Sequence, residues 1–256
     1  MRARHPMLAA TVPAVVLGLA DTAARADSAL VAVAANFAQA AEVIAGRFAE
    51  ATGHEAELTT GSTGKLYAQI VEGAPFEVLL SADAATPERL EAEGLGVAGS
   101  RFTYAVGRMV LWSADPGRIG ADPAATLTAE TTRHIAIANP DLAPYGAAAR
   151  EALRNLGIWD AVEPRIVMGE NIGQAHSMVA SGAADVGFVA LSAIDAPGKE
   201  AEGSRWDVPQ QLFTPIRQDA VLLKAGAENP AAVAFLDFLG SDVGREVAES
   251  FGYAVD

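Results

Sequence analysis

Short apolar runs typical of β-strands alternate with segments of helical spacing along most of this chain, and this alternation restricts the fold more than any other feature. We expect strands at 30–35, 56–60, 78–81, 108–113, 134–138, 165–168 and 186–191. Strands that alternate with helices pack into layered α/β folds. The sequence therefore predicts an α/β fold with largely parallel sheets.

The segment 37–52 illustrates the helical pattern. Its apolar residues recur every three or four positions, and Gly53 after it suits the left-handed residue that ends many helices. Another helix is expected to begin at a Thr86 cap, with Pro87 as its first residue. Further helices are expected at 64–71, 146–156, 173–181, 231–239 and 242–250.

The order of these elements predicts two lobes. An extended run at 212–223 follows the second group of strands and is expected to cross back to the first group. We expect residues 27–104 and 217–256 in the first lobe and residues 105–216 in the second. Open α/β sheets bind ligands beyond the carboxyl ends of their strands, and clefts between lobes are preferred binding places. The sequence thus predicts two α/β lobes joined by two crossing strands, with a ligand cleft between them.

The first 26 residues have the pattern of a secretory signal peptide. Arg2 and Arg4 precede an apolar stretch at 7–20, and a small-x-small cleavage signal ends at Ala26. The alternative, a membrane anchor, fits less well because a span needs about 20 apolar residues. The chain has no cysteine, so it has no site for a lipid on cysteine and no disulfide. We expect a soluble protein outside the cytoplasm that begins at Asp27.

The charge of the chain excludes some classes of partner. The formal net charge is −14, and removal of the leader, with three arginines and one aspartate, brings the mature chain to −16. So acidic a protein is a poor partner for nucleic acid or for an anionic membrane surface. Any site for an anion must therefore act locally, through dipoles and hydrogen bonds.

Four segments have the composition of such a local anion site. In 31–37, 61–67, 143–146 and 171–177, a strand-like or loop run ends in small or hydroxyl residues, and in three of them a helical pattern then begins. The first turn of a helix has unpaired backbone N–H groups and a partial positive charge. Several such turns aimed at one cleft would bind a small anion without an arginine.

The motifs in these segments also resemble a known family, the periplasmic molybdate-binding proteins of ABC transporters, over nearly all of the mature chain. The resemblance implies a two-lobed periplasmic binding protein that captures molybdate or tungstate and delivers it to a transmembrane permease. It implies no enzymatic activity, no cofactor and a monomer in the periplasm. The motifs are Ala34–Phe37, Gly61–Gly64, Gly73–Pro75, Leu80–Asp83, Asn139-Pro140 with Ala143–Gly146, and Asn171–Ser177.

The same resemblance implies which residues surround the oxyanion, whose metal atom has no direct protein ligand. The six candidates are Ala35, Asn36, Ser62, Thr63, Tyr145 and Ile172. Asn36 is expected to donate from its side-chain amide and its backbone, and Thr63 from its hydroxyl and its amide. Ser62 is a weaker candidate, while Tyr145 and Ile172 are expected to offer main-chain N–H groups.

Two positions depart from the pattern of many relatives. Ala35 stands where many have a serine hydroxyl, and Ala190 stands where many have a tyrosine hydroxyl. The chain resembles a subgroup with asparagine after the first strand. We therefore expect Asn36 to compensate for the missing donors.

Simpler interpretations of these residues remain open at this stage. Asn36 and Thr63 belong to residue types that routinely cap helices. Lys65 is either a solvated lysine or a positive charge near the site. The ligand could instead be sulfate or phosphate, and a secreted oxyanion sensor would fit the same features.

Catalytic interpretations are less well supported. Gly61–Lys65 resembles the end of a phosphate-binding P-loop, but Thr59 and Leu66 stand where that motif requires glycine and a hydroxyl residue. A hydrolase built on His176, Ser177 and Asp185 is disfavoured because neighbours on one helix do not face each other. The histidines of the mature chain are isolated, so a zinc site is not expected.

Overall fold

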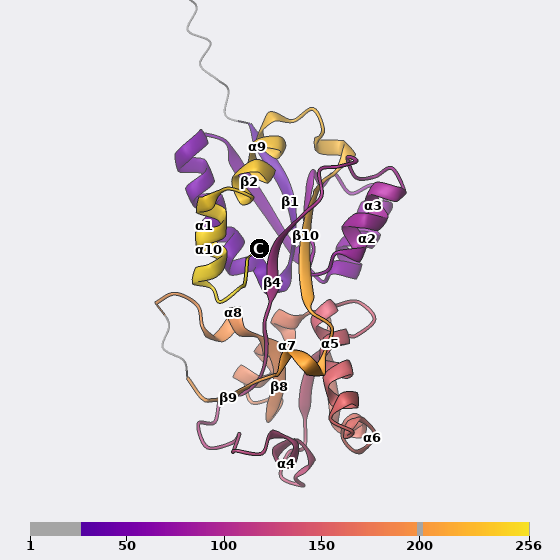
Figure 1. The fold of residues 1–256 in the computed structure, drawn as a ribbon, viewed down its shortest axis with the longest axis vertical. Helices are drawn as coiled ribbons and strands as arrows, with labels where there is room; N and C mark the ends of the chain where they lie inside the picture. The colour runs from indigo at the N-terminus through magenta and orange to yellow at the C-terminus, as the bar shows by residue number, and fades with distance from the viewer. Residues whose placement is uncertain (1–26, 199–201, 256) are drawn as a thin grey trace, which may run out of the picture.

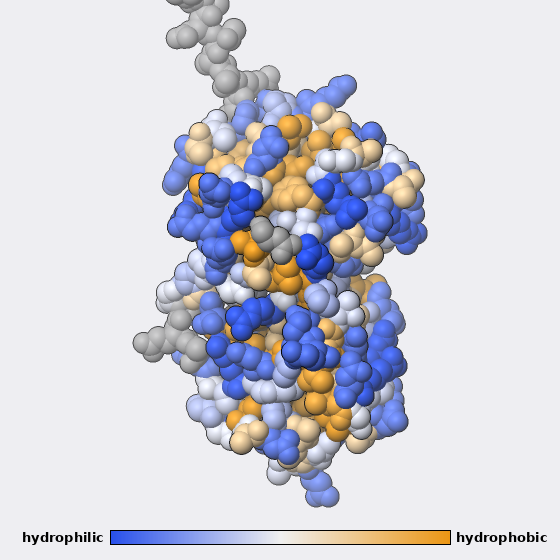
Figure 2. Space-filling view, in the orientation of Figure 1, coloured by the Kyte–Doolittle hydropathy of each residue, from blue (hydrophilic) through white to orange (hydrophobic). Residues whose placement is uncertain are grey.

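The computed structural model describes residues 27–198 and 202–255. They form two α/β lobes, one above the other in Figure 1, and each lobe is built on one five-stranded sheet. Hydrophilic residues cover most of the face shown in Figure 2, as expected for a chain of net charge −14. The expected signal peptide, with its cleavage after Ala26, lies outside the described residues.

The first lobe is built on β1 (Ser28–Ala34), β2 (Glu55–Gly61), β3 (Val78–Leu80), β4 (Phe102–Gly107) and β10 (Ile216–Leu222). Their order in the sheet is β2-β1-β3-β10-β4. The strands β2, β1 and β3 are parallel, and β10 runs antiparallel to both of its neighbours. The carboxyl ends of β1, β2 and β3 therefore lie along one edge, which faces the second lobe (Figure 1).

Helices cover both faces of this sheet. In Figure 1, α1, α9 and α10 lie on one side of the sheet and α2 and α3 on the other. Phe48 of α1 packs edge-on against Phe235 of α9, with ring centroids 5.3 Å apart. The bounds are α1 (Ala38–Thr52), α2 (Thr63–Val71), α3 (Ala85–Ala92), α9 (Pro230–Leu239) and α10 (Asp242–Ser250).

The second lobe repeats this plan with β5 (Met109–Ser113), β6 (Ile135–Ala138), β7 (Ile166–Gly169), β8 (Val186–Ala190) and β9 (Ser204–Asp207). Their order is β7-β6-β8-β5-β9, with β7, β6 and β8 parallel and β5 antiparallel to both neighbours. The helices of this lobe are α4 (Pro123–Thr128), α5 (Pro144–Asn155), α6 (Trp159–Val162), α7 (Ile172–Ala180) and α8 (Leu191–Ile194).

Two crossing segments join the lobes. The chain leaves the first sheet at the end of β4, Gly107, and enters the second sheet at Met109. It returns to the first sheet at Ile216, the start of β10. The prediction of two α/β lobes joined by two crossing strands is thus confirmed (Figure 1).

The expectation of largely parallel sheets holds for three neighbouring strands of each sheet, β2-β1-β3 in the first lobe and β7-β6-β8 in the second. The strands that carry the chain between the lobes, β10 and β5, run antiparallel to the strands beside them. A strand that enters from the other lobe begins at the edge where the three parallel strands of its sheet end. It therefore runs in the opposite direction to them. Each sheet is therefore mixed.

The start of α3 also differs from the expectation. The helix begins at Ala85, one residue before the expected cap Thr86. The carboxylate of Asp83 accepts a hydrogen bond from the Thr86 backbone N–H at 2.8 Å. Asp83, two residues before the helix, thus pairs with the backbone N–H of Thr86. Thr86 was expected to stand before the helix as its cap, but it lies inside the first turn. The threonine side chain was the wrong choice of cap.

Candidate functional site

A small cavity lies between the two lobes, where the carboxyl ends of β1, β2, β3, β6 and β7 meet. It encloses about 200 Å³ of space not filled by protein atoms. All six residues that the sequence suggested line it, although they come from four separate segments. The lining residues are Ala34, Ala35, Asn36, Gly61, Ser62, Thr63, Ala82, Ala143, Pro144, Tyr145, Asn171 and Ile172.

Helix N-termini surround this cavity. The helices α2, α5 and α7 begin at Thr63, Pro144 and Ile172, and a 3₁₀ turn, Ala35–Phe37, begins beside them. The first N–H groups of a helix have no partner within the helix, and they carry its partial positive charge. The cavity is thus lined by backbone donors from both lobes.

Close packing brings the first turn of α5 to the cavity. At Gly146, the third residue of this helix, any side chain would collide with the backbone carbonyl of Ala138 at the end of β6. Only glycine allows this approach. The N–H of Tyr145 is consequently held at the strand end, where the cavity lies.

Two hydroxyl groups from the start of α2 lie at the cavity. Thr63 is 2% exposed, and its Oγ1 accepts a hydrogen bond from the Ala82 backbone N–H at 3.1 Å, which leaves its own hydrogen for another acceptor. The Ser62 Oγ is buried and has no hydrogen-bond partner among the described residues. A buried polar group without a partner is costly, so an acceptor placed in the cavity would stabilise this hydroxyl.

The helix-capping interpretation of Asn36 and Thr63 is wrong. Neither the 3₁₀ turn at Ala35–Phe37 nor α1 has a side-chain cap hydrogen bond, and Ser62 at the N-cap position of α2 makes none either. The N–H groups at the start of α2 are therefore not satisfied by a local side chain. In α7, by contrast, Asn171 does cap the helix, because its Oδ1 accepts from the Gln174 N–H at 3.0 Å.

Asn36 does not aim its side-chain amide hydrogens at the cavity. Its Nδ2 lies 2.7 Å from Gln218 Oε1 and 3.2 Å from Tyr253 Oη. Both hydrogens of the amide therefore have partners within the protein, and the expectation that this N–H₂ group serves an anion needs correction. The donor that Asn36 offers is its backbone N–H.

The side chain of Tyr145 is buried in the protein and does not line a surface turn. Its side chain is 1% exposed, and its Oη accepts a hydrogen bond from Gln218 Nε2 at 3.4 Å. Burial raises the pKa of this phenol well above its usual value, so it stays neutral. The roles of Gln218 and Tyr253 could not be predicted from the sequence, because their partners are far away along the chain.

Contacts across the rim hold the lobes together. The Gly64 N–H donates to the Leu142 carbonyl at 2.9 Å, and the Lys65 ammonium pairs with the Glu170 carboxylate at 2.6 Å. Lys65 is therefore not simply a solvated lysine. Glu170 lies two residues before α7 and is the carboxylate nearest in sequence to that end of the site. Its negative charge is paired with Lys65 at the rim.

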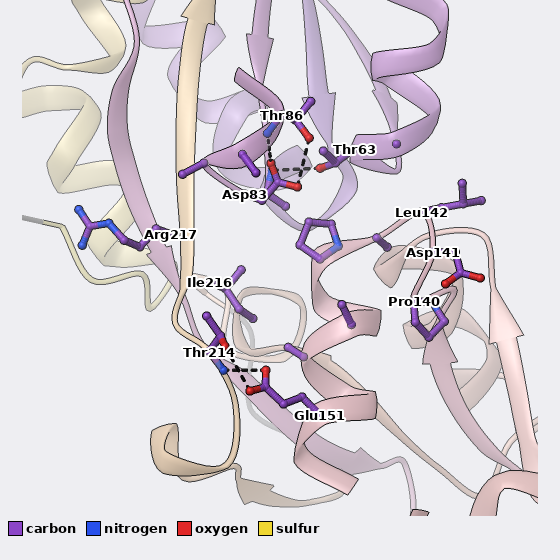
Figure 3. Close-up of a pocket in the computed structure, with 18 of the residues that line it drawn as sticks. Thr63, Asp83, Thr86, Pro140, Asp141, Leu142, Glu151, Thr214, Ile216 and Arg217 are labelled. Carbon is purple, nitrogen blue, oxygen red and sulfur yellow. Dashed lines mark hydrogen bonds between the residues drawn. The ribbon is translucent and has the colours of Figure 1, made fainter. Parts of the chain in front are cut away.

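A second, larger hollow, with about 1210 Å³ of space not filled by protein atoms, lies beside the cavity and shares Thr63, Ala82, Ala143 and Pro144 with it. Figure 3 shows this groove between the Asp83–Thr86 segment, α5 and the lower end of β10. Carboxylates line the groove, but each has a partner. Asp83 is bonded to Thr86 and Glu151 to the Thr214 N–H at 2.8 Å.

The described residues form neither a metal site nor the hydrolase triad considered from the sequence. Among them, no group of three or more His, Cys, Asp or Glu could hold a metal ion. His176 stacks on Trp112, with ring centroids 5.0 Å apart, while the Asp185 carboxylate accepts from the Arg133 and His134 backbone N–H groups. No hydrolase triad is assembled there. Within the described ranges, no helix is long and apolar enough to cross a membrane.

Comparison with known proteins places the chain in a family. Residues 29–254 match the family described as bacterial extracellular solute-binding protein. The molybdate-binding protein ModA of Azotobacter vinelandii is 50% identical over 248 residues, which cover 97% of this chain and 98% of that protein. ModA of Rhodobacter capsulatus is 51% identical over 247 residues, 96% of each chain.

A solved structure supports the same relationship. The periplasmic molybdate-binding protein of Azotobacter vinelandii matches with a TM-score of 0.85 at 43% identity, over 89% of this chain and 99% of that one. The sulfate-binding protein SubI of Mycobacterium tuberculosis matches with a TM-score of 0.67 at 16% identity, which shows a shared fold only.

Proposed function

The chain belongs to the bacterial extracellular solute-binding protein family, and on this premise we propose that it captures molybdate or tungstate between its lobes and delivers the anion to the permease of an ABC importer. Proteins of this family are components of transport, not enzymes. The two relatives at about 50% identity are molybdate-binding proteins, and we expect molybdate as the ligand here with no cofactor. The family acts outside the cytoplasm.

The observation that carries this proposal is the lining of the small cavity. The six suggested residues meet there, the Ser62 hydroxyl is buried without a partner, and no carboxylate is among the residues that line the cavity. Donors alone suit an anion that only accepts hydrogen bonds. Molybdate and tungstate are fully ionised at neutral pH and are anions of this kind.

We assign the contacts as follows. The hydroxyls of Ser62 and Thr63 donate to the anion, together with backbone N–H groups of Asn36, Tyr145 and Ile172. Ala35 forms the wall beside Asn36 and contributes no side-chain donor. The metal atom of the oxyanion has no direct protein ligand.

The donor set also supports discrimination against phosphate. Monohydrogen phosphate carries a proton that needs an acceptor, and an unpaired buried polar group costs roughly 1–3 kcal/mol. Phosphate is therefore expected to bind at least about tenfold more weakly than molybdate. Sulfate is fully ionised but smaller, so its rejection depends on the size of the cavity.

Further parts of the proposal concern the whole molecule. We propose that the leader is removed after Ala26, that the mature protein is a periplasmic monomer, and that the lobes divide at 27–104 with 217–256 and at 105–216. The contacts of Gly64 and Lys65 across the rim belong to a closed arrangement of these lobes.

A calorimetric titration of the mature protein against molybdate, tungstate, sulfate and phosphate tests the function. Molybdate and tungstate should bind tightly and with one anion per chain, and phosphate should bind more weakly by the factor given above. Folded protein that shows no binding of either molybdate or tungstate would contradict the proposal, and so would equal affinities for phosphate and molybdate.

A further inference from the structure

We propose that Gln218 is a positioning residue for anion capture, which holds Asn36 of the first lobe and Tyr145 of the second lobe in one buried hydrogen-bonded cluster. Gln218 lies on β10, one of the two segments that join the lobes. This inference rests on the proposed function, because it assumes that Asn36 and Tyr145 present their backbone N–H groups to the anion.

Every polar atom of the Gln218 side chain has a partner. Its Oε1 accepts from Asn36 Nδ2 at 2.7 Å and from Tyr104 Oη at 3.1 Å, and its Nε2 donates to Tyr145 Oη at 3.4 Å. The residue is 0% exposed. A buried amide with partners on both ends has one preferred orientation, because any other leaves polar atoms unpaired.

The two crossing segments together make room for this side chain. The pairing of β10 with β4 shifts its register between Gln218 and Asp219, and such a bulge re-aims the side chain beside it. On β4, a side-chain carbon at Gly107 would lie 2.6 Å from Gln218 Nε2 and would collide with Tyr145 Oη. The bulge and the glycine thus create the space that Gln218 and Tyr145 share.

Asn36 is fixed from further directions. Its carbonyl oxygen accepts from Tyr253 Oη at 2.6 Å and from Ser192 Oγ at 3.0 Å. Tyr253 belongs to the C-terminal segment and Ser192 to α8 of the second lobe. Asn36 is consequently held at its carbonyl by both lobes and at its side chain by the crossing strand.

The cluster carries no net charge of its own near neutral pH. Burial raises the pKa of Tyr104 and Tyr145 well above the usual value and that of Tyr253 to about 12. The neighbouring Asp219 carboxylate is bonded to Arg101 and Thr103, at 2.7 Å each. A neutral amide at position 218 therefore aligns the donors without repelling the anion.

The decisive variant is Gln218→Glu. A carboxylate keeps the shape and still accepts from Asn36 and Tyr104, but it places a negative charge in the cluster that contacts Asn36 and Tyr145 of the proposed site. We expect molybdate affinity at about pH 8 to fall at least roughly thirtyfold, since charges interact strongly in a site shielded from water. Burial raises the pKa of a carboxyl, so affinity should recover as the pH is lowered towards about 5.5.

The matched control is Gln211→Glu, the same chemical change at an exposed position of the second lobe. Its molybdate affinity should equal that of the unchanged protein at each pH, and neither should show the pH profile of Gln218→Glu. Melting without molybdate reports whether each variant is folded. Folded Gln218→Glu with unchanged affinity and no pH profile would overturn the inference.

If Gln218→Glu does not fold, Gln218→Met, which keeps the volume but has no hydrogen-bonding group, decides the matter. Its affinity should fall by roughly tenfold or more, in line with the cost of unpaired buried groups, and Gln218→Met with unchanged affinity would overturn the inference. If the unchanged protein does not bind molybdate at all, the proposed function fails and the inference fails with it. If the unchanged protein binds molybdate and both Gln218 variants bind it with the same affinity, the role of Gln218 is refuted and the proposed function stands.

Discussion

The small cavity and the larger groove lie side by side and share part of their walls, yet their chemistry is opposite. The cavity is lined by backbone N–H groups and hydroxyls, one of which has no partner. The groove is about six times larger by the same measure of volume, and its lining includes the carboxylates of Asp83, Asp141 and Glu151 beside one cation, Arg217. The comparison teaches that the choice of site for an anion depends on which groups line a hollow and on whether they are already paired, and not on its size.

The strongest way to break this contrast is to place a carboxylate at the wall of the cavity. Asn36→Asp keeps the size of the side chain but removes the donors to Gln218 and Tyr253 and adds a negative charge beside a dianion. We expect molybdate affinity to fall at least about a hundredfold. Calorimetric titration measures the loss. Asn36→Ala should lose less, because the backbone N–H remains.

The corresponding control removes a carboxylate from the groove. Glu151→Gln takes away the negative charge that accepts from Thr214. Molybdate affinity should stay within about threefold of the unchanged protein, since we propose the cavity and not the groove as the anion site. A gain as large as the loss in Asn36→Asp would mean that the groove, and not the cavity, governs binding.

The rise in Tm on anion binding tests the cavity in the unchanged protein, without any substitution. An anion that binds only the folded state stabilises it by about 4 kcal/mol at a thousandfold excess over Kd. For a chain of this length that corresponds to a rise in Tm of roughly 8–16 °C. Differential scanning calorimetry should show the rise with molybdate or tungstate and hardly any with chloride. Equal shifts with all three salts would point to a general salt effect.

The unpartnered hydroxyl allows a finer test. Ser62→Ala removes a buried group that lacks a partner in the empty cavity, so stability without molybdate should be unchanged or slightly higher. With molybdate bound, a hydrogen bond to a charged acceptor is lost, and affinity should fall by roughly ten- to thirtyfold. Melting and titration of the same preparation separate the two effects. A variant that melts lower but binds as tightly would assign Ser62 to structure only.

The ion pair at the rim should give the smallest effect. Lys65 and Glu170 are each about half exposed, and exposed pairs contribute roughly 0.2–1 kcal/mol. Lys65→Met and Glu170→Gln should each raise the rate of molybdate release about two- to fivefold at low salt. Stopped-flow dissociation at rising ionic strength should bring the variants and the unchanged protein together. A difference that persists at high salt would exclude a screened charge pair as its cause.

The local features of the fold were predictable from the sequence. The apolar spacing in 37–52 predicted α1, and Gly53 after it has the expected positive φ of 76°. The short strand β9 and the start of α3 were not predicted. The sequence of β9, Ser-Arg-Trp-Asp, contains only one apolar residue and so no apolar run marks it, and the Asp83 carboxylate competes with Thr86 for the role of cap.

The site was predictable where it depends on local sequence and not where it depends on distant contacts. Thr63 and Ile172 stand at helix starts that the sequence indicated, and the structure brings both to the cavity. The partners of Asn36 lie 182 and 217 positions away, at Gln218 and Tyr253. No pattern within a window of the sequence could have shown that its amide is already engaged.

The bond from Tyr253 to Asn36 also has a consequence for the order in which the protein becomes functional. It joins positions 217 apart, and the loops closed by such remote pairs form late, because chain entropy opposes them until the intervening structure exists. The first strand can fold early, yet Asn36 at its end reaches its final position only after the segment that carries Tyr253 has docked. Anion binding is therefore a late event in the maturation of the chain, and the onset of binding during refolding reports that assembly is complete.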